Sequence, residues 1–342
     1  MRKGTSMKEA MFYRKLDESK VACFLCAQLC RIEPGKRGQC GVRENRDGTL
    51  LSLVYGRLIA QNIDPIEKKP LYHFYPGSKI LSIGSLGCTM KCMFCQNYRI
   101  SQATPESYNQ PNSYSVESIV KLASKQAGNI GIAFTYNEPG TFYEYMIEVA
   151  KLAIPAGLKT VMVTNGYINR EPLEALIPYI DAFNVDLKAF SESFYKSITQ
   201  SRLSPVKKTI QRIAQAKKHL EITNLVIPGM NDNYAEFEEM VLWISKETGD
   251  QTPLHISRYF PDYQLKIAST PINLLLDLYE IAKKHLKYVY LGNVVDTSRD
   301  TTFCHECNHT LIIREPDKTI ITGLDMNGNC TNCGNHVLDY IH

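Results

Sequence analysis

The sequence of 342 residues contains no run of 18 or more apolar residues, and no apolar segment follows its basic amino-terminal residues. A transmembrane helix and a secretory signal peptide both need such a segment, so neither is expected. The net charge is only +4, and the lysines and arginines are scattered rather than gathered into a basic stripe. This distribution disfavours a nucleic-acid-binding protein. We therefore expect a soluble, cytoplasmic protein that binds neither membranes nor nucleic acids.

Internal repeats and low-complexity segments are also absent, and no cysteine occurs between Cys95 and Cys304. The contents of 44% hydrophobic and 22% charged residues are close to those of average globular proteins, so we expect a large buried core. The length allows one catalytic domain with small additional units. We place these units at residues 1–75, 76–295 and 296–342.

The eleven cysteines form three tight groups of four, three and four residues. Cysteines in a reducing cytoplasm rarely form disulfides, and clustered spacing there indicates metal ligands. Four cysteines complete the coordination of a zinc ion or a cluster, whereas three leave one position free. The amino-terminal group is Cys23, Cys26, Cys30 and Cys40, the middle group is Cys88, Cys92 and Cys95, and the carboxyl-terminal group is Cys304, Cys307, Cys330 and Cys333.

Short apolar runs alternate with amphipathic stretches from about residue 78 to residue 293. This pattern is typical of an α/β fold in which βα units surround a parallel sheet. Six or so units are too few for a closed eight-stranded barrel, so we expect an open, partial barrel. Helices are expected at 116–126, 142–154 and 171–177, with Pro155 ending the second. The expected strands are 80–85, 131–136, 159–164, 182–187, 220–227, 254–257 and 288–291.

The middle cysteine group follows directly on the first expected strand, with the spacing Cys88-x3-Cys92-x2-Cys95. Three thiolates within eight residues suit a short loop wrapped around an iron–sulfur cubane. The fourth iron has no ligand in this stretch, so a small molecule with an amine and a carboxylate can chelate it. A zinc loop that borrows a distant fourth ligand is the alternative.

This loop and other stretches resemble the radical S-adenosylmethionine (SAM) superfamily, in the branch of the pyruvate formate-lyase activating enzymes. Over nearly its whole length, the sequence resembles the radical SAM member of the AmmeMemoRadiSam system. The resemblance rests on residues 23–45, 64–78, 87–97, 136–139, 164–166 and 186–188.

The resemblance implies a partial (β/α)6 TIM-like barrel that holds a 4Fe-4S cluster and SAM at the carboxyl ends of its strands. The polar motifs do fall at the ends of expected strands, where barrel enzymes place their chemistry. It also implies an oxidoreductase-like or activase-like reaction. A low-potential flavodoxin- or ferredoxin-type donor would reduce the cluster. SAM would then be cleaved to a 5′-deoxyadenosyl radical that abstracts hydrogen from a substrate.

Roles for single residues near SAM follow from the same resemblance. Glu138 corresponds to the acid that takes the methionine amine, although Tyr136 and Asn137 replace two glycines of the family. A helix N-cap is the alternative role of this acid. Phe94 corresponds to the aromatic residue near adenine. Val163 replaces an acid of the activases, which leaves a bound monovalent cation open. Further candidates for cofactor binding are Asn137, Thr164, Asn165, Asp186, Lys188, His255 and Arg258.

The carboxyl-terminal spacing C-x2-C-x22-C-x2-C predicts a zinc ribbon around an expected strand at 310–314, with mononuclear iron in a rubredoxin-like site as the alternative. A segment of about forty residues buries too little surface to fold alone, so we expect its metal to be structural. The amino-terminal spacing C-x2-C-x3-C-x9-C ends in a knuckle-like segment, which favours zinc or mononuclear iron. An auxiliary 4Fe-4S cluster is the alternative there.

The amino-terminal unit is expected to consist mainly of metal-binding loops. The proline- and aromatic-rich segment 64–76 should be stiff and should pack on the barrel. We therefore expect this unit to lie over the open mouth of the barrel and to shape the substrate site. Tyr72 and His73 are its candidates for reaching the cleft, with simple packing as the alternative role of each.

Two reactions remain open within radical SAM chemistry. One is modification of a small metabolite or another target, together with the two AmmeMemo partner proteins. We favour it because the amino-terminal cysteine unit and the ribbon are absent from minimal activases. The other is formation of a glycyl radical on a partner protein. A non-catalytic zinc protein that binds nucleic acids is the alternative from another class, but the intact cysteine loop and the modest charge argue against it.

Overall fold

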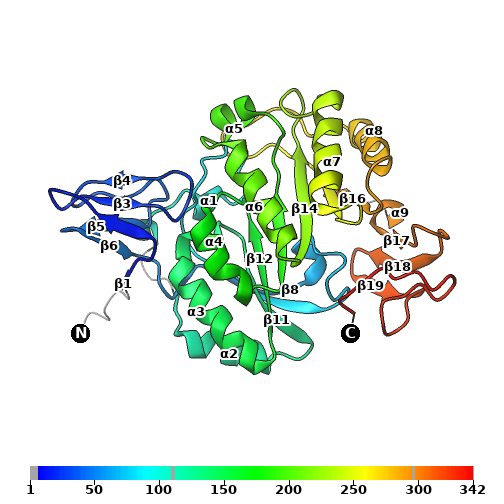
Figure 1. Ribbon diagram of the computed structural model, residues 1–342, viewed down its shortest axis with the longest axis horizontal. Coiled ribbons are helices and arrows are strands. Elements are labelled where there is room, and N and C mark those ends of the chain that lie inside the picture. Colours follow the sequence, from blue (N-terminus) through cyan, green and yellow to red (C-terminus); the bar gives the residue numbers. More distant parts are fainter. Residues whose placement is uncertain (1–6, 109–111, 295–296, 342) are drawn as a thin grey trace.

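The computed structural model describes residues 7–108, 112–294 and 297–341. Its centre is one eight-stranded sheet with the strand order β16-β15-β14-β13-β12-β11-β9-β8 (Figure 1). Seven strands are parallel, and β8 (Ala60–Pro65) pairs antiparallel with β9 at one edge. Among the described residues no pairing joins β8 to β16, so the barrel is open. The parallel strands are β9 (Lys79–Gly84), β11 (Asn129–Phe134), β12 (Lys159–Thr164), β13 (Ala182–Asp186), β14 (His219–Val226), β15 (Leu254–Arg258) and β16 (Val289–Gly292).

The expected partial barrel is confirmed, and each of the seven expected strands overlaps a parallel strand of this sheet. Buried parallel strands are continuous apolar runs, which is why they are visible in the sequence. Strand β8 was not expected. Its sequence is polar, its side chains are mostly half-buried or exposed, and it ends in Pro65, which is tolerated on an edge strand.

The helices that follow the parallel strands pack on the outer face of the sheet, as Figure 1 shows. Ser115, Ser191 and Asn233 each accept a backbone N–H at the start of a helix. The second expected helix ends at Ala153, and Pro155 lies in the 3-10 turn that follows. The helices are α1 (Tyr98–Ser101), α2 (Val116–Lys125), α3 (Tyr143–Ala153), α4 (Arg170–Leu176), α5 (Glu192–Ile198), α6 (Leu203–Gln215), α7 (Tyr234–Thr248), α8 (Ile272–Lys283) and α9 (Thr297–Asp300). No helix of the described ranges is long and apolar enough to cross a membrane.

The amino-terminal unit contains two small three-stranded sheets where we expected mainly loops (Figure 1, left). Its apolar side chains, such as Val21, Val42 and Leu50, belong to the same buried cluster as the barrel core. The unit is therefore packed firmly on the barrel. Its strands are β1 (Lys8–Glu9), β2 (Tyr13–Lys15), β3 (Val21–Cys23), β4 (Arg31–Ile32), β5 (Arg43–Arg46) and β6 (Thr49–Ser52), followed by β7 (Arg57–Leu58), which pairs with β10 (Asn112–Ser113).

The carboxyl-terminal ribbon is a three-stranded sheet of β17 (Thr302–Phe303), β18 (Thr310–Glu315) and β19 (Lys318–Ile321). It packs against Tyr288 and Tyr290 at the edge strand β16. It also contacts the connection between β8 and β9, where Thr319 donates a hydrogen bond of 2.9 Å to Glu67. The ribbon thus touches both edges of the open sheet. The expected boundary between barrel and ribbon, at residues 295 and 296, lies outside the described residues.

Candidate active site and metal centres

A cavity of about 730 Å³ opens at the carboxyl ends of the parallel strands. Most of the walls come from the last residues of the parallel strands and the segments after them, because parallel strands present their carboxyl ends at one edge of the barrel. Ten of the twelve catalytic and cofactor-binding candidates line it, whereas His255 and Arg258 do not. The ten are Cys88, Cys92, Phe94, Cys95, Asn137, Glu138, Thr164, Asn165, Asp186 and Lys188.

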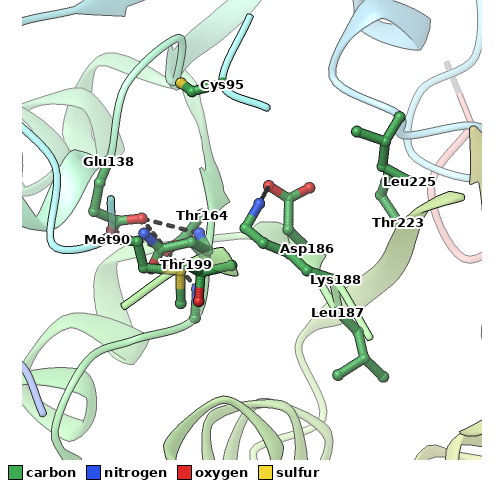
Figure 2. Close-up of polar contacts among 12 residues, drawn as sticks. Met90, Cys95, Glu138, Thr164, Asp186, Leu187, Lys188, Thr199, Thr223 and Leu225 are labelled. Carbon is green, nitrogen blue, oxygen red and sulfur yellow. Dashed lines mark hydrogen bonds and ion pairs between the residues drawn. The ribbon is translucent and has the colours of Figure 1, made fainter. Parts of the chain in front are cut away.

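Glu138 is buried in the cavity wall after β11, and burial raises its pKa. Its carboxylate accepts hydrogen bonds from the backbone N–H of Gly140 (3.0 Å), the backbone N–H of Asn165 (2.9 Å) and the Thr164 hydroxyl (3.0 Å). Figure 2 shows the carboxylate turned toward Thr164. Glu138 caps the 3-10 turn Pro139–Phe142, so the alternative role named from the sequence is realised. Since the side chain also faces the cavity, the cap does not exclude contact with a ligand.

Asp186 and Lys188 form an ion pair with a distance of 2.8 Å at the end of β13 (Figure 2). The Lys188 ammonium also lies 5.7 Å from the centre of the Phe94 ring. Burial opposes the charge of Lys188, but Asp186 and Cys92 raise its pKa above the ordinary value. A protonated lysine therefore stands beside the cysteine loop, where it stabilises negative charge.

The middle cysteine group lies in the loop between β9 and α1 and faces the cavity. The side-chain amide of Asn165 lies 3.5 Å from the Cys88 sulfur. Burial raises the pKa of the Cys88 thiol above its ordinary range and that of Cys92 to about 12. Thiols in this setting are protonated unless a bound cation compensates for the loss of water. The donor set and its burial therefore suit iron rather than free nucleophilic thiolates.

Two of the cofactor-binding candidates do not reach the cavity. His255 shares the face of β15 with Ser257, which lines the cavity. It lies two residues earlier and so about 6.6 Å nearer the floor of the barrel, the end formed by the amino termini of the parallel strands. There its Nε2 contacts Glu221 at 2.6 Å. The Arg258 side chain leaves the strand on the opposite face, and its Nε donates a 2.8 Å bond to the Thr270 carbonyl.

The sequence analysis missed a polar network on the wall formed by β8. Lys69 donates a 2.7 Å bond to Asp64, and the Tyr136 hydroxyl donates a 2.6 Å bond to the same carboxylate. Asn62 donates to the Tyr136 hydroxyl at 3.1 Å. Burial lowers the pKa of Lys69. The stretch 64–78 was a signal, but the antiparallel strand that turns Asn62 and Asp64 to the cavity was not visible in it.

The cysteine-bearing part of the amino-terminal unit does not line the cavity, contrary to our expectation, whereas the end of the unit, from Asn62 to Pro70, does. In the described part of the chain, the first lining residue is Asn62, within β8. Tyr72 and His73 lie at the floor of the barrel, where both backbone N–H groups donate to Glu221 at 3.0 and 2.7 Å. Pro70, two residues before Tyr72, still lines the cavity, whereas Tyr72 and His73 do not.

The carboxyl-terminal cysteines converge. Their four sulfur atoms all lie within 4.8 Å of one another, and two of the Sγ–Sγ distances are 3.6 and 3.7 Å. Four thiolates around one zinc ion, with Zn–S bonds of about 2.3 Å, lie roughly 3.8 Å apart. This group could therefore hold a single metal ion.

Comparisons with known proteins agree with this geometry. Residues 82–244, which span the cysteine loop and the strands through β14, match the Radical SAM superfamily. The chain is 40% identical over 334 residues to an uncharacterised protein of Methanocaldococcus jannaschii, covering 97% of this chain and 99% of the relative. The chain belongs to the radical SAM superfamily. It is therefore an enzyme, and the family implies a 4Fe-4S cluster and SAM.

More distant radical SAM relatives match part of the chain. The 4-hydroxyphenylacetate decarboxylase activating enzyme of Clostridium scatologenes is 21% identical over 221 residues, covering 60% of this chain and 66% of the relative. The structure of Streptococcus suis SuiB bound to S-adenosylmethionine is similar in fold, with a TM-score of 0.50 at 15% identity. That match covers 63% of this chain and 52% of SuiB.

The radical SAM cofactors fit the residues present. In the described part of the chain, the carboxyl-terminal group is the one in which three or more sulfur atoms lie within 4.8 Å of one another. The sulfurs of the middle group are therefore spread too widely for one metal ion, as a cubane requires. Cys88, Cys92 and Cys95 would hold the cluster. The polar side chains that face them would hold the amine and carboxylate of SAM.

Proposed function

We propose that this enzyme cleaves SAM reductively and uses the resulting 5′-deoxyadenosyl radical to abstract hydrogen from a substrate, as a radical SAM enzyme of the AmmeMemoRadiSam type. The observation that carries the proposal is the cavity of about 730 Å³ in which the middle cysteine group faces Glu138, Asn165 and the Asp186–Lys188 pair. When bound, the reduced cluster and SAM supply the radical chemistry.

The role of the chain's own residues would be to bind and orient SAM and the substrate. Glu138 would accept the ammonium of the methionine part, because it is a buried carboxylate whose position is fixed by three donors. Lys188 would balance negative charge at the cysteine loop, and Phe94 would pack against adenine. The wall formed by β8 and the segment after it, with Asp64 and Lys69, is left to face the substrate, and its buried ion pair favours a polar target.

Production of a glycyl radical on a partner protein is the second candidate. Two curated relatives are activating enzymes, including that of (2S)-3-sulfopropanediol dehydratase from Klebsiella oxytoca, which is 23% identical over 142 residues. These matches cover 60% and 40% of this chain, so each alignment leaves at least 40% of the chain without a counterpart. This difference favours a target other than a glycyl-radical enzyme. The proposed partners are a flavodoxin- or ferredoxin-type electron donor and the two AmmeMemo proteins.

Anaerobic reconstitution followed by reduction with dithionite tests the reaction. The protein should convert SAM to 5′-deoxyadenosine and methionine, measured by liquid chromatography. The variant with Cys88, Cys92 and Cys95 changed to Ala should lose both cleavage and SAM binding. The matched control is Cys304→Ser, which removes one cysteine of the ribbon and should keep cleavage. Cleavage that persists in the triple variant would refute the proposal.

The choice between the two targets needs a separate measurement. The reduced enzyme is incubated with SAM and either a glycyl-radical enzyme or the two AmmeMemo proteins. Electron paramagnetic resonance records a glycyl radical, and liquid chromatography records turnover as 5′-deoxyadenosine formed. A glycyl radical signal on the first partner would support the activase, and its absence together with turnover in the second mixture would support the AmmeMemo type.

A further inference from the structure

The amino-terminal cysteines differ from the ribbon cysteines in how far apart their sulfur atoms lie. Among the described residues, the ribbon is the cysteine group whose sulfurs lie within 4.8 Å of one another. No three sulfurs of the amino-terminal group meet that limit. Neither do the three sulfurs of the catalytic loop, which is the loop that carries Cys88, Cys92 and Cys95. In a cubane each thiolate binds a different iron, so the cysteine sulfurs are roughly 6 Å apart. The amino-terminal group therefore resembles the catalytic loop rather than the ribbon.

All four amino-terminal cysteines line one enclosed cavity, together with apolar Leu25 and Ile32 and the side chain of Arg43. Protein interiors are close-packed, and a space surrounded by four sulfur atoms is unusual in them. Four cysteine ligands around one mononuclear ion would meet at contact distance and leave no such space. A larger inorganic group fits the arrangement better.

Arg43 supplies a second observation at this cavity. It is 1% exposed, and it forms an ion pair with buried Glu144. Its Nη1 lies 3.9 Å from the Cys23 sulfur, and its Nε has no hydrogen-bond partner within the described ranges. Buried N–H groups almost always have an acceptor. A thiolate or sulfide of a cluster would be such an acceptor, and the backbone N–H of Gln39 already lies 3.5 Å from the Cys30 sulfur.

The cavity lies directly behind the catalytic loop. Thr89, next to Cys88, is one of its lining residues, and the Gln28 amide donates a 2.9 Å bond to the Thr89 carbonyl. Gly87, on the other side of Cys88, is so close to the Cys40 carbonyl oxygen that a Cβ there would lie 2.5 Å from it. One layer of backbone separates the two cysteine groups.

We propose that the amino-terminal cysteine group holds a second 4Fe-4S cluster, ligated by all four of its cysteines and seated against the back of the catalytic loop. Every iron of this cluster carries a protein ligand, so SAM does not bind it. This property separates it from the catalytic cluster in a binding experiment. The inference is independent of the substrate and of the reaction proposed above.

Iron analysis and Mössbauer spectroscopy of anaerobically reconstituted protein test the proposal. The variant in which Cys88, Cys92 and Cys95 are Ser should keep about four irons per chain, with a cubane spectrum that SAM does not change. Adding Cys26→Ser and Cys40→Ser should remove that spectrum. A single zinc or iron ion in place of the four irons would overturn the proposal.

The wild-type protein and the ribbon variant complete the test. Wild type should contain about eight irons in cubane clusters, and SAM should perturb the spectrum of about half of them. The control Cys304→Ser should keep all of the cubane iron. If the triple variant does not fold, the wild-type spectrum decides, because about four cubane irons per chain would overturn the proposal.

Discussion

Glu138 has two roles in this site, and two substitutions separate them. The carboxylate caps the turn after β11, and we propose that it also accepts the methionine ammonium of SAM. Glu138→Ala removes the charge and every acceptor, whereas Glu138→Gln removes the charge but keeps one acceptor oxygen. The two variants should therefore differ in stability and agree in SAM affinity.

The structure sets the size of each effect. Glu138→Ala leaves the N–H groups of Gly140 and Asn165 and the Thr164 hydroxyl without their acceptor. Each loss costs about 1 kcal/mol or slightly more, since water can enter from the cavity, which gives about 3 kcal/mol in total. For 342 residues the entropy of unfolding is about 0.7 kcal/mol per degree, so Tm should fall by about 4 °C. Glu138→Gln should lose roughly half as much.

The loss of SAM affinity should be the same in both variants. A carboxylate–ammonium contact contributes about 1.5 to 3 kcal/mol, which corresponds to a roughly ten- to hundred-fold increase in Kd. Differential scanning fluorimetry measures Tm, and equilibrium dialysis of the reconstituted protein measures Kd. A Glu138→Gln variant with an unchanged Kd would refute the ligand role and leave the cap alone.

Three further predictions concern Gly87, His73 and the ribbon. Gly87→Ala forces a side chain against the Cys40 carbonyl, so it should lower Tm by several degrees and reduce cluster loading, measured as iron content. Gly157→Ala is the control, because Gly157 has a similar positive φ with open space around it, and this variant should lose only the stability that backbone strain costs. Burial lowers the pKa of His73 to about 3, so between about pH 3 and pH 6.5 this histidine is protonated in the unfolded chain but not in the folded one. The free energy of unfolding should therefore fall by about 1.4 kcal/mol for each pH unit as the pH decreases through this range. His73→Gln should flatten the pH dependence of urea unfolding, and an unchanged slope would contradict this. Cys304→Ser should release about one metal ion and destabilise the ribbon, whereas a loss of about four irons would show that the ribbon holds a cluster.

The sequence predicted the barrel and most of the cavity for a definite physical reason. Buried parallel strands are continuous apolar runs, and the polar residues that follow them must meet at one edge. The cysteine loop, Glu138 and Asp186 were therefore placed correctly at the cavity. Predicting that a residue lies at the cavity requires only the position at which its strand ends, and the end of an apolar run in the sequence marks that position.

Depth within the barrel and the face of a strand were harder to predict. His255 lies on the inward face but one layer too low, and Arg258 lies on the outward face, although both belong to a correctly predicted strand. A shift of one or two residues decides these outcomes, and the apolar pattern does not resolve it. The antiparallel strand β8, with Asp64, depends on pairing with β9, which is a tertiary contact without a local pattern.

The ribbon has a mechanical consequence for an open barrel. Tyr340 pairs with Phe74 at the floor, and Arg314 donates a 2.7 Å bond to the Tyr72 carbonyl, while the ribbon core holds Tyr290 of β16. The ribbon and the segment after it thus bridge the gap between the two edge strands of the open sheet. The lower ends of β8 and β16 are therefore joined through the ribbon. A chain shortened before Tyr340 should lose its bridge to Phe74 and with it one of the contacts that hold these two edges together.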